Sequence, residues 1–397
     1  MRYLILSFIF MGLLSAQTLP QLVSTALKKH PSLKSIKHRL QRMDIEIQKS
    51  QHWKNPDISL NMNDIQFSQP FKRDLEPMQF QSVVFKQQFP WFGKLEAYKG
   101  LEVAKKGLLL NTYEKAKVSL SKEIHLSVYT LKEMEARLEI LHRYQRLVKE
   151  NIELYHSYTS TQESSHSKSI SAKLMLSKLY IREENYRSML EIQKAKLSYL
   201  TQKKFTTVNV SLEIKKPKKL SYYLAKLRNN PSYQDKKSSE YIAQKQKTIQ
   251  QLQLHPDPYV QVGYFNRTGY NDYTSVSVGV SLPLYGTEKL NLEKSKLDIL
   301  STHLDTLDFY TSLESEIEMM HIKLNESYKI YHIIQKSSLP QLKHMLELSQ
   351  SDIQQGADLL SYTKLLEQQL FLEEEALTVK AHYFRTQSSL NALIGVL

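Results

Sequence analysis

Histidine and carboxylate side chains are the first candidates for chemistry in this sequence, which has 13 histidines and no cysteine. His156 and His166 flank a turn rich in serine and threonine, YHSYTSTQESSHSKS. No pair of histidines has the spacing of a helical or short-loop metal site with a carboxylate beside it. We therefore expect these two histidines to be solvated turn residues, and we predict neither a metal ion nor a cofactor.

Clustered acidic residues suggest a second chemistry, general acid–base catalysis. One cluster is Glu373–Glu375, and another is Glu133 with Glu135. Lysine and arginine lie beside both, so we expect exposed helical faces. No glycine-rich phosphate loop, nucleophile elbow or paired carboxylates in a cleft accompany them. The sequence therefore predicts a protein that is not an enzyme.

The formal net charge is +14, which raises the question of an anionic partner. The basic residues are spread along expected helical faces with acids between them, apart from the cluster KKPKK at 215–219. No nucleic-acid-binding motif accompanies them. We interpret the charge as a solvated helical surface and predict no nucleic-acid partner.

The N-terminus, MRYLILSFIFMGLLSAQT, has one arginine, an apolar run and then small residues. This pattern is typical of a signal peptide, here residues 1–16 with cleavage after Ala16. Because the chain has no cysteine, lipid attachment at the cleavage site and disulfides are excluded. No later stretch has 18 uninterrupted apolar residues, so we expect no membrane-spanning helix after the signal.

Long helices must supply most of the structure, because only 10 glycines and 12 prolines punctuate 397 residues. Apolar residues recur every three to four positions in heptad-like seams, for example Leu290, Leu297 and Leu304. Such narrow seams are typical of coiled coils. From 95 to 155 no proline intervenes, which predicts one helix of about 90 Å.

Four short segments alternate apolar and polar residues, as β-strands with two different faces do. The clearest is VSVGVSLPLYG at 276–286, in which Val276, Val278, Val280, Leu282 and Leu284 form the apolar row. Strands of this kind suit a transmembrane barrel. Four strands cannot close one, because the smallest such barrels need about eight. Closure therefore requires several chains.

The sequence repeats its plan once. NPD at 55–57 matches HPD at 255–257 at an offset of 200, and PWFG at 90–93 matches PLYG at 283–286 at an offset of 193. The plan is helix, strand, turn, strand, Pro-aromatic-Gly, helix. We predict a first repeat at 17–203 with a helix, a β-hairpin and a long helix pair. A linker follows at 204–220, and the second repeat is 221–397.

Two stretches, QQFPWFGK at 87–94 and QQGADLLSYTKLLEQQ at 354–369, resemble a known family when taken with the order of the repeated marks. They are similar to the TolC-type outer membrane efflux proteins, and QQFPWFGK resembles the heavy-metal branch of that family. The match covers almost the whole chain after the signal.

The resemblance implies a mainly α fold with a small β part. Each chain would contribute long helices and four strands, and three chains would share one long coiled-coil α-helical barrel and one 12-stranded transmembrane β-barrel. This homotrimer would lie in outer membrane lipid of a Gram-negative bacterium, with its tunnel in the periplasm and the linker 204–220 at the tunnel equator. It would be the passive exit duct of a tripartite efflux system for heavy-metal cations. Its partners would be a periplasmic adaptor protein and an inner-membrane pump of the RND type.

The repeated Pro-aromatic-Gly segments would be joints between barrel and tunnel. Proline ends a strand because it cannot donate a ladder hydrogen bond, glycine permits the turn into a helix, and aromatic residues favour the lipid–water boundary. The predicted joint residues are Pro90, Trp91, Phe92, Gly93, Pro283, Tyr285 and Gly286.

The resemblance also places periplasmic tips, which close the tunnel at rest and meet the adaptor, at about 156–169 and 350–358. Gly356 matches the family glycine. The family often has aspartates beyond that glycine, whereas this sequence continues LLSYTK, so an acidic ring could come only from Asp352, Asp358 or Glu367. The predicted tip and gate residues are Asp352, Gly356, Asp358, Glu367, Glu163 and Ser169.

Two alternatives remain open from the sequence. A duct for a type I protein secretion system would use the same tunnel. An exported coiled-coil structural or adhesin-like protein would keep its strands outside a membrane, and dependence on detergent would distinguish it from a duct.

Overall fold

The computed structural model describes residues 17–158, 164–353 and 359–396. The chain divides into two compact units. The helical unit comprises Met1–Lys34, Glu114–Asn230 and Ser312–Leu397, and the sheet unit comprises Ser35–Tyr113 and Pro231–Thr311. Each unit takes segments from both sequence repeats, so the proposed repeat boundaries at 203 and 221 remain a prediction about the sequence.

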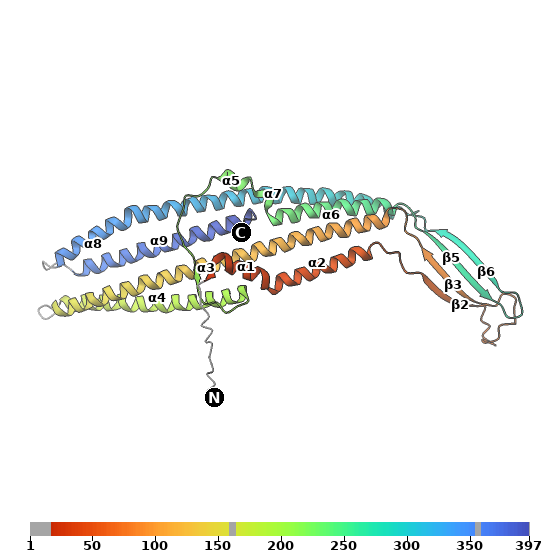
Figure 1. Ribbon diagram of the computed structural model, residues 1–397, viewed down its shortest axis with the longest axis horizontal. Helices are drawn as coiled ribbons and strands as arrows, with labels where there is room; N and C mark the ends of the chain where they lie inside the picture. The colour runs from red at the N-terminus through yellow and green to blue at the C-terminus, as the bar shows by residue number, and fades with distance from the viewer. Residues whose placement is uncertain (1–16, 159–163, 354–358, 397) are drawn as a thin grey trace, which may run out of the picture. The chain divides into compact units, whose positions relative to one another are not determined.

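The sheet unit contains one antiparallel four-stranded sheet in the order β2-β3-β5-β6 (Figure 1). The strands are β2 (Asp57–Asn63), β3 (Phe80–Gln88), β5 (Pro258–Asn266) and β6 (Tyr273–Val280). Two hairpins, one from each repeat, meet where β3 pairs with β5. Strands β2 and β6 are therefore the two edges.

One face of this sheet is apolar because the alternating residues stay in phase across all four strands. Leu60 lies opposite Val83, Val83 opposite Tyr264, and Val262 opposite Val276. Leu60 and Val276 are exposed in the single chain.

The apolar row on the last strand is shorter than the sequence predicted. β6 ends at Val280, so Leu282 and Leu284 lie beyond the strand. Alternation alone could not reveal this end, which follows from the partner strand: β5 begins at Pro258, opposite Val280.

Helices lead into and out of the sheet. α2 (Pro31–Lys49) precedes β2, and α6 (Pro231–Gln253) precedes β5. α3 (Lys94–Tyr158) follows β3, and α7 (Thr287–Ile333) follows β6. The 65 residues of α3 confirm the long helix predicted from the absence of proline.

The helical unit begins with β1 (Gln17–Thr18) and α1 (Leu19–Lys29). It also contains the later parts of α3 and α7, and its remaining elements follow in chain order. These are α4 (Ser164–Thr201), β4 (Val208–Asn209), α5 (Leu220–Leu224), η2 (Leu227–Asn229), η3 (Ile334–Ser338), α8 (Leu339–Ile353) and α9 (Leu359–Leu393).

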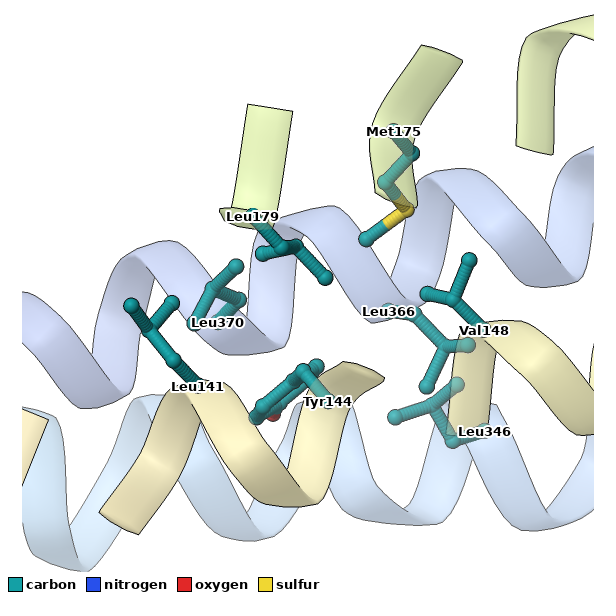
Figure 2. Packing of buried hydrophobic residues seen from close by; sticks show 8 residues of the cluster. All are labelled: Leu141, Tyr144, Val148, Met175, Leu179, Leu346, Leu366 and Leu370. Atoms are coloured by element: carbon teal, nitrogen blue, oxygen red, sulfur yellow. The ribbon is translucent and has the colours of Figure 1, made fainter. Parts of the chain in front are cut away.

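A hydrophobic core joins α3, α4, α8 and α9 (Figure 2). Tyr144 and Leu141 are almost fully buried, as expected for residues that recur on one side of a coiled-coil helix. The labelled cluster consists of Leu141, Tyr144, Val148, Met175, Leu179, Leu346, Leu366 and Leu370.

Helix α7 continues into α8 through the π-helical segment η3. Pro340 lacks a backbone N–H, and in an α-helix its ring would clash with the carbonyl of Lys336 four residues earlier. The N–H of Leu339 instead donates to the carbonyl of Ile334, five residues earlier. One wider turn thus accommodates the proline without ending the helical path.

The predicted linker at 204–220 has little regular secondary structure. Its short strand β4 pairs in parallel with β1. The hydroxyl of Tyr383 donates to the Lys215 carbonyl at 2.5 Å, so backbone contacts hold the linker against α9. Among the described helices, none combines the length and the hydropathy needed to cross a membrane.

Candidate functional site: joints and helix ends

Both predicted joints have the glycine geometry that the sequence implied. Gly93 has φ +84° and Gly286 has φ +76°, a left-handed conformation that costs other residues free energy. Each glycine immediately precedes a long helix, since α3 begins at Lys94 and α7 at Thr287.

The first joint is fastened to the start of β5 by one carboxylate. Asp257 Oδ1 accepts hydrogen bonds from the backbone N–H of Trp91 and from Lys94 Nζ, both at 2.7 Å. Lys94 Nζ also donates to the His255 carbonyl at 2.8 Å. The Lys94 residue is only 6% exposed, so its charge is stabilised by these partners rather than by water.

Aromatic packing supports the same joint. The Trp91 ring stacks on the His255 ring, with centroids 5.4 Å apart and 12° between the planes. Phe92 is exposed, and its ring meets the Trp91 ring edge-on with centroids 5.9 Å apart. The chain therefore passes from β3 to α3 at a fixed position relative to β5.

The second joint lacks this fastening within one chain. By the repeat offsets, Leu284 corresponds to Trp91, Thr287 to Lys94, and Asp57 to Asp257. Asp57 is exposed, and its carboxylate has no hydrogen bond or ion pair with any described residue. Tyr285 is 98% exposed. The two joints share a backbone geometry but differ in their contacts.

Polar contacts also cross the helical unit, from α3 and α4 to α9. Glu133 accepts from Arg137 at 2.8 Å and from Arg385 at 2.5 Å. Glu374 pairs with Arg182 at 2.8 Å and accepts from the Tyr186 hydroxyl at 3.2 Å. These bonds connect side chains from three helices into one network.

Two of these acids correct the sequence interpretation. Glu133 and Glu374 are 7% and 9% exposed, whereas we expected both on exposed faces. Acidic residues next to lysine and arginine in the sequence are found on exposed helix faces and also in ion pairs buried between helices. The sequence pattern alone therefore does not distinguish the two environments.

A second polar cluster surrounds Glu183 on α4. Its carboxylate accepts from Gln145 Nε2 at 2.7 Å and interacts with His142 Nε2 at 3.0 Å and Arg187 at 2.5 Å. The hydrogen bonds from Gln145 and His142, followed by that from Arg187, lower the pKa of Glu183 to about 2.

A cavity of about 500 Å³ lies in the helical unit, between α3, α9 and the segment around η3. Arg143 and Glu373, which form an ion pair, line it together with Arg146 and Lys380. Burial raises the pKa of Glu373 and lowers that of Lys380.

Most of the predicted tip residues cannot be placed. Glu163, Gly356 and Asp358 lie outside the described residues. Ser169 belongs to α4 and Asp352 to α8, and their side chains lie outside the description. Glu367 lies on α9 and lines a cavity of about 610 Å³ between α8 and α9. The tip role of these six residues therefore remains a prediction.

No group of three or more His, Asp or Glu side chains that could hold a metal occurs among the described residues. The prediction for His156 and His166 stays untested, because the side chains of both histidines lie outside the description. The paired roles of Lys94 and Asp257 were not predicted from the sequence. Their signal was present in the repeated Pro-Asp before one strand and the Gly-Lys after another.

The chain shares its fold with solved outer membrane channels. It matches CusC, known from structures of folding and transmembrane channel formation, with TM-score 0.80 and 12% identity over 95% of this chain and 92% of the other. The open state of the Neisseria gonorrhoeae MtrE outer membrane channel matches with TM-score 0.79 and 13% identity over 96% and 89%. The Vibrio cholerae outer membrane protein VceC matches with TM-score 0.77 and 15% identity over 95% and 96%.

No family model matches the sequence, and no curated protein does. The structural likeness confirms the predicted fold class, the TolC-type combination of long helices with a small four-stranded sheet.

Proposed function

We propose that this protein is the outer membrane exit duct of a tripartite efflux system, a passive channel made by three copies of the chain. The observation that carries the proposal is the exposed apolar face of the four-stranded sheet. Leu60 is 78% exposed and Val278 is 74% exposed in the single chain. A continuous apolar face of this kind needs a cover, and lipid is the cover that suits alternating antiparallel strands.

The two sheet edges support assembly from several chains. β2 and β6 each have a partner on one side only. In lipid, an unpaired backbone group costs several kcal/mol, so an open sheet is not viable there. Three copies would supply twelve strands in a closed homotrimeric barrel, with the long helices continuing as a tunnel.

The proposed location is the outer membrane of a Gram-negative bacterium, with the helices in the periplasm. A periplasmic adaptor and an inner-membrane pump of the RND type are the proposed partners. The tips at 156–169 and 350–358 would close the tunnel and meet the adaptor. Glu163, Ser169, Asp352, Gly356, Asp358 and Glu367 are the proposed tip residues.

Heavy-metal cations are the proposed cargo, which the resemblance of QQFPWFGK to the metal branch supports. The test is metal accumulation in cells that carry the chain together with a pump and an adaptor of the proposed types. Deleting the chain should raise intracellular metal. Unchanged metal levels together with loss of a secreted protein would replace efflux by the secretion duct.

The channel itself is tested by fractionation, native mass measurement and conductance. The purified protein should require detergent, have the mass of three chains and conduct ions in a planar bilayer. A water-soluble protein without conductance would contradict the proposal and favour the exported coiled-coil alternative.

A further inference from the structure

The contact between the two repeats is made once within the chain, where β3 of the first repeat pairs with β5 of the second. The other possible contact between the repeats would pair β6, the last strand of the second repeat, with β2, the first strand of the first. The single chain does not make this pairing, so β6 and β2 are the sheet edges. We propose that β6 of one protomer pairs with β2 of a second copy in a defined register, and that Asp57 of the second copy fastens the second joint. The inference rests on the proposed trimeric duct and specifies its seam.

The offsets of 200 and 193, taken from the repeated sequence marks, supply the residue equivalences, and helix contacts agree with the sum of the two offsets. In the first repeat, Asp44 of α2 pairs with Lys106 of α3. In the second, Glu240 of α6 pairs with His303 of α7 at 3.2 Å. The residue numbers of the two pairs add up to 150 and 543. Their difference, 393, equals the two offsets together.

A second helix contact gives the same result. Lys37 lies over the Tyr113 ring in the first repeat, and Tyr233 contacts Tyr310 in the second. These numbers again add up to 150 and 543. The two helix pairs therefore share one antiparallel register, which agrees with the sum of the offsets, and the repeated sequence marks supply the separate values.

The register of the seam follows from the pairing of β3 with β5. There Gln87 lies opposite Val260. The offsets transfer this pair to Val280 of one protomer and Leu60 of the next. Leu282, which lies beyond the end of β6 in the single chain, would then lie opposite Ile58.

This register preserves the two faces of the sheet. Val280 opposite Leu60 and Val278 opposite Met62 join apolar residues on one face. Ser281 opposite a second copy's Ser59 joins polar residues on the other. A slip by one residue would place apolar side chains opposite polar ones along the whole seam.

Asp57 is the residue that this seam would satisfy. At the first joint, Asp257 accepts from the Trp91 N–H and from Lys94. At the second joint, the equivalent donors are the Leu284 N–H and the Thr287 hydroxyl, so a neutral donor replaces the ammonium. In the single chain the Leu284 N–H donates to the Leu282 carbonyl at 3.0 Å in a three-residue turn. In the trimer this N–H would instead donate to Asp57 of the second copy.

The helices continue the same seam. Where the two repeats meet within the chain, Gly93 and Gly100 on the α3 side lie near Leu252 and Lys245 on the α6 side. The offsets transfer Lys245 to Ile45, an apolar residue that is 63% exposed on α2.

On the partner helix α7, the same transfer places Ile45 opposite Glu293, which lies one helical turn from both Leu290 and Leu297. Leu297 is 66% exposed, and Leu290 is exposed as well. The seam therefore covers exposed apolar residues from both helices, which the single chain leaves in water.

Cysteine cross-linking tests the register, and the cysteine-free chain gives a clean background. The variant Leu60→Cys with Val280→Cys should form covalent dimers and trimers when outer membranes are oxidised. The matched control, Gln87→Cys with Val260→Cys, has the equivalent geometry within one chain and should oxidise without any increase in mass.

Two further variants test neighbouring registers. Val280→Cys is combined with Ile58→Cys or with Met62→Cys, whose Cα atoms would lie about 7–8 Å away on the diagonal, beyond ordinary disulfide reach. The Ile58 variant is the stringent one. Within the second hairpin, the offsets would place Pro258 opposite Val278, but Pro258 lies opposite Val280. The strand registers of the two hairpins therefore differ by two residues, and the same shift at the seam would place Val280 opposite Ile58.

Oxidation is continued until the intramolecular control is complete. Dimers and trimers from the Leu60 variant alone then support the register. Cross-linking through Ile58 or Met62 in a protein of trimeric mass overturns the register and leaves the proposed duct intact. A monomeric native mass overturns both.

A double-mutant cycle tests the Asp57 contact. Asp57→Asn and Thr287→Val should each lower the temperature at which the trimer dissociates, and the double variant should lose little more than the larger single effect. Additive losses would overturn the contact between these two side chains.

Discussion

At the scale of single residues, Lys94 and Asp257 show how a buried charge can position a joint. The ammonium lies 2.7 Å from the carboxylate and 2.8 Å from a carbonyl oxygen. Removing either the ammonium or the carboxylate leaves the other charge partly buried without its hydrogen-bonding partner. The pair therefore matters more for where α3 begins than a surface ion pair would.

Lys94→Met should destabilise the protein by about 2 kcal/mol, because Asp257 keeps its burial but loses a charged donor. Thermal dissociation of the purified protein measures the loss. The control is Lys99→Met on the same helix, where an exposed pair with Glu96 at 3.7 Å should contribute less than about 0.5 kcal/mol. Equal effects would contradict the special role of the joint.

Glu183 provides a prediction on pH. Its pKa of about 2 lies below the ordinary value of 4.5, so the folded state favours the ionised form. The stabilisation is complete above pH 4.5 and is lost as the pH falls through about 2.

Glu183→Gln should therefore lower the melting temperature at pH 6.5, through a loss of about 1 kcal/mol. Most of that difference from the parent should disappear near pH 2. The control is Glu184→Gln at the exposed neighbouring position. A difference that stays constant from pH 6.5 to pH 2 would show that the carboxylate charge is not what stabilises this contact.

At the scale of elements, sequence reasoning worked where a local rule decides the structure. The proline-free run predicted α3, and the glycines at 93 and 286 predicted the turn into each long helix. The rule failed where a partner decides. Leu282 continued the strand pattern past the end of its partner, and Glu133 had the composition of a surface position although helices surround it.

The segment η3 shows the same limit. Pro340 is visible in the sequence, but a proline can end a helix, kink it or be accommodated by a wider turn. Packing of buried residues on both sides, including Ile334 and Leu342, favours the continuous path. Periodicity alone carries no information on that choice.

Leu297 tests the helical seam at this scale. Leu297→Glu should reduce the yield of assembled trimer strongly, because the proposed seam buries this leucine against α2 of a second copy. The exposed control Lys296→Glu, at the adjacent position, should assemble normally. If no seam forms, Leu297 is a surface residue, and its replacement should change stability by less than about 0.5 kcal/mol.

At the scale of the whole molecule, the tips are the proposed moving parts. Gly356 is the only glycine between Gly286 and Gly395. Gly356→Val should leave outer membrane insertion and trimer mass unchanged while reducing cargo export or adaptor cross-linking, because the substitution restricts the backbone only at the proposed tip. Export at the full rate would remove Gly356 from the gate, and failure to assemble would make this turn a folding element.

The membrane assignment is tested on the two faces of one strand. Val276 lies near the middle of β6 on the exposed apolar face, and Ser277 follows it on the other face. In a barrel, Val276 would contact lipid and Ser277 the lumen. Val276→Arg should then cost about 2 to 4 kcal/mol near the bilayer midplane, whereas the guanidinium of Ser277→Arg would remain in water. The amount of heat-resistant trimer in outer membranes should fall with Val276→Arg and stay near the parental level with Ser277→Arg. Equal tolerance of both substitutions would mean that neither face meets lipid, and the strands would then belong to a protein outside the membrane.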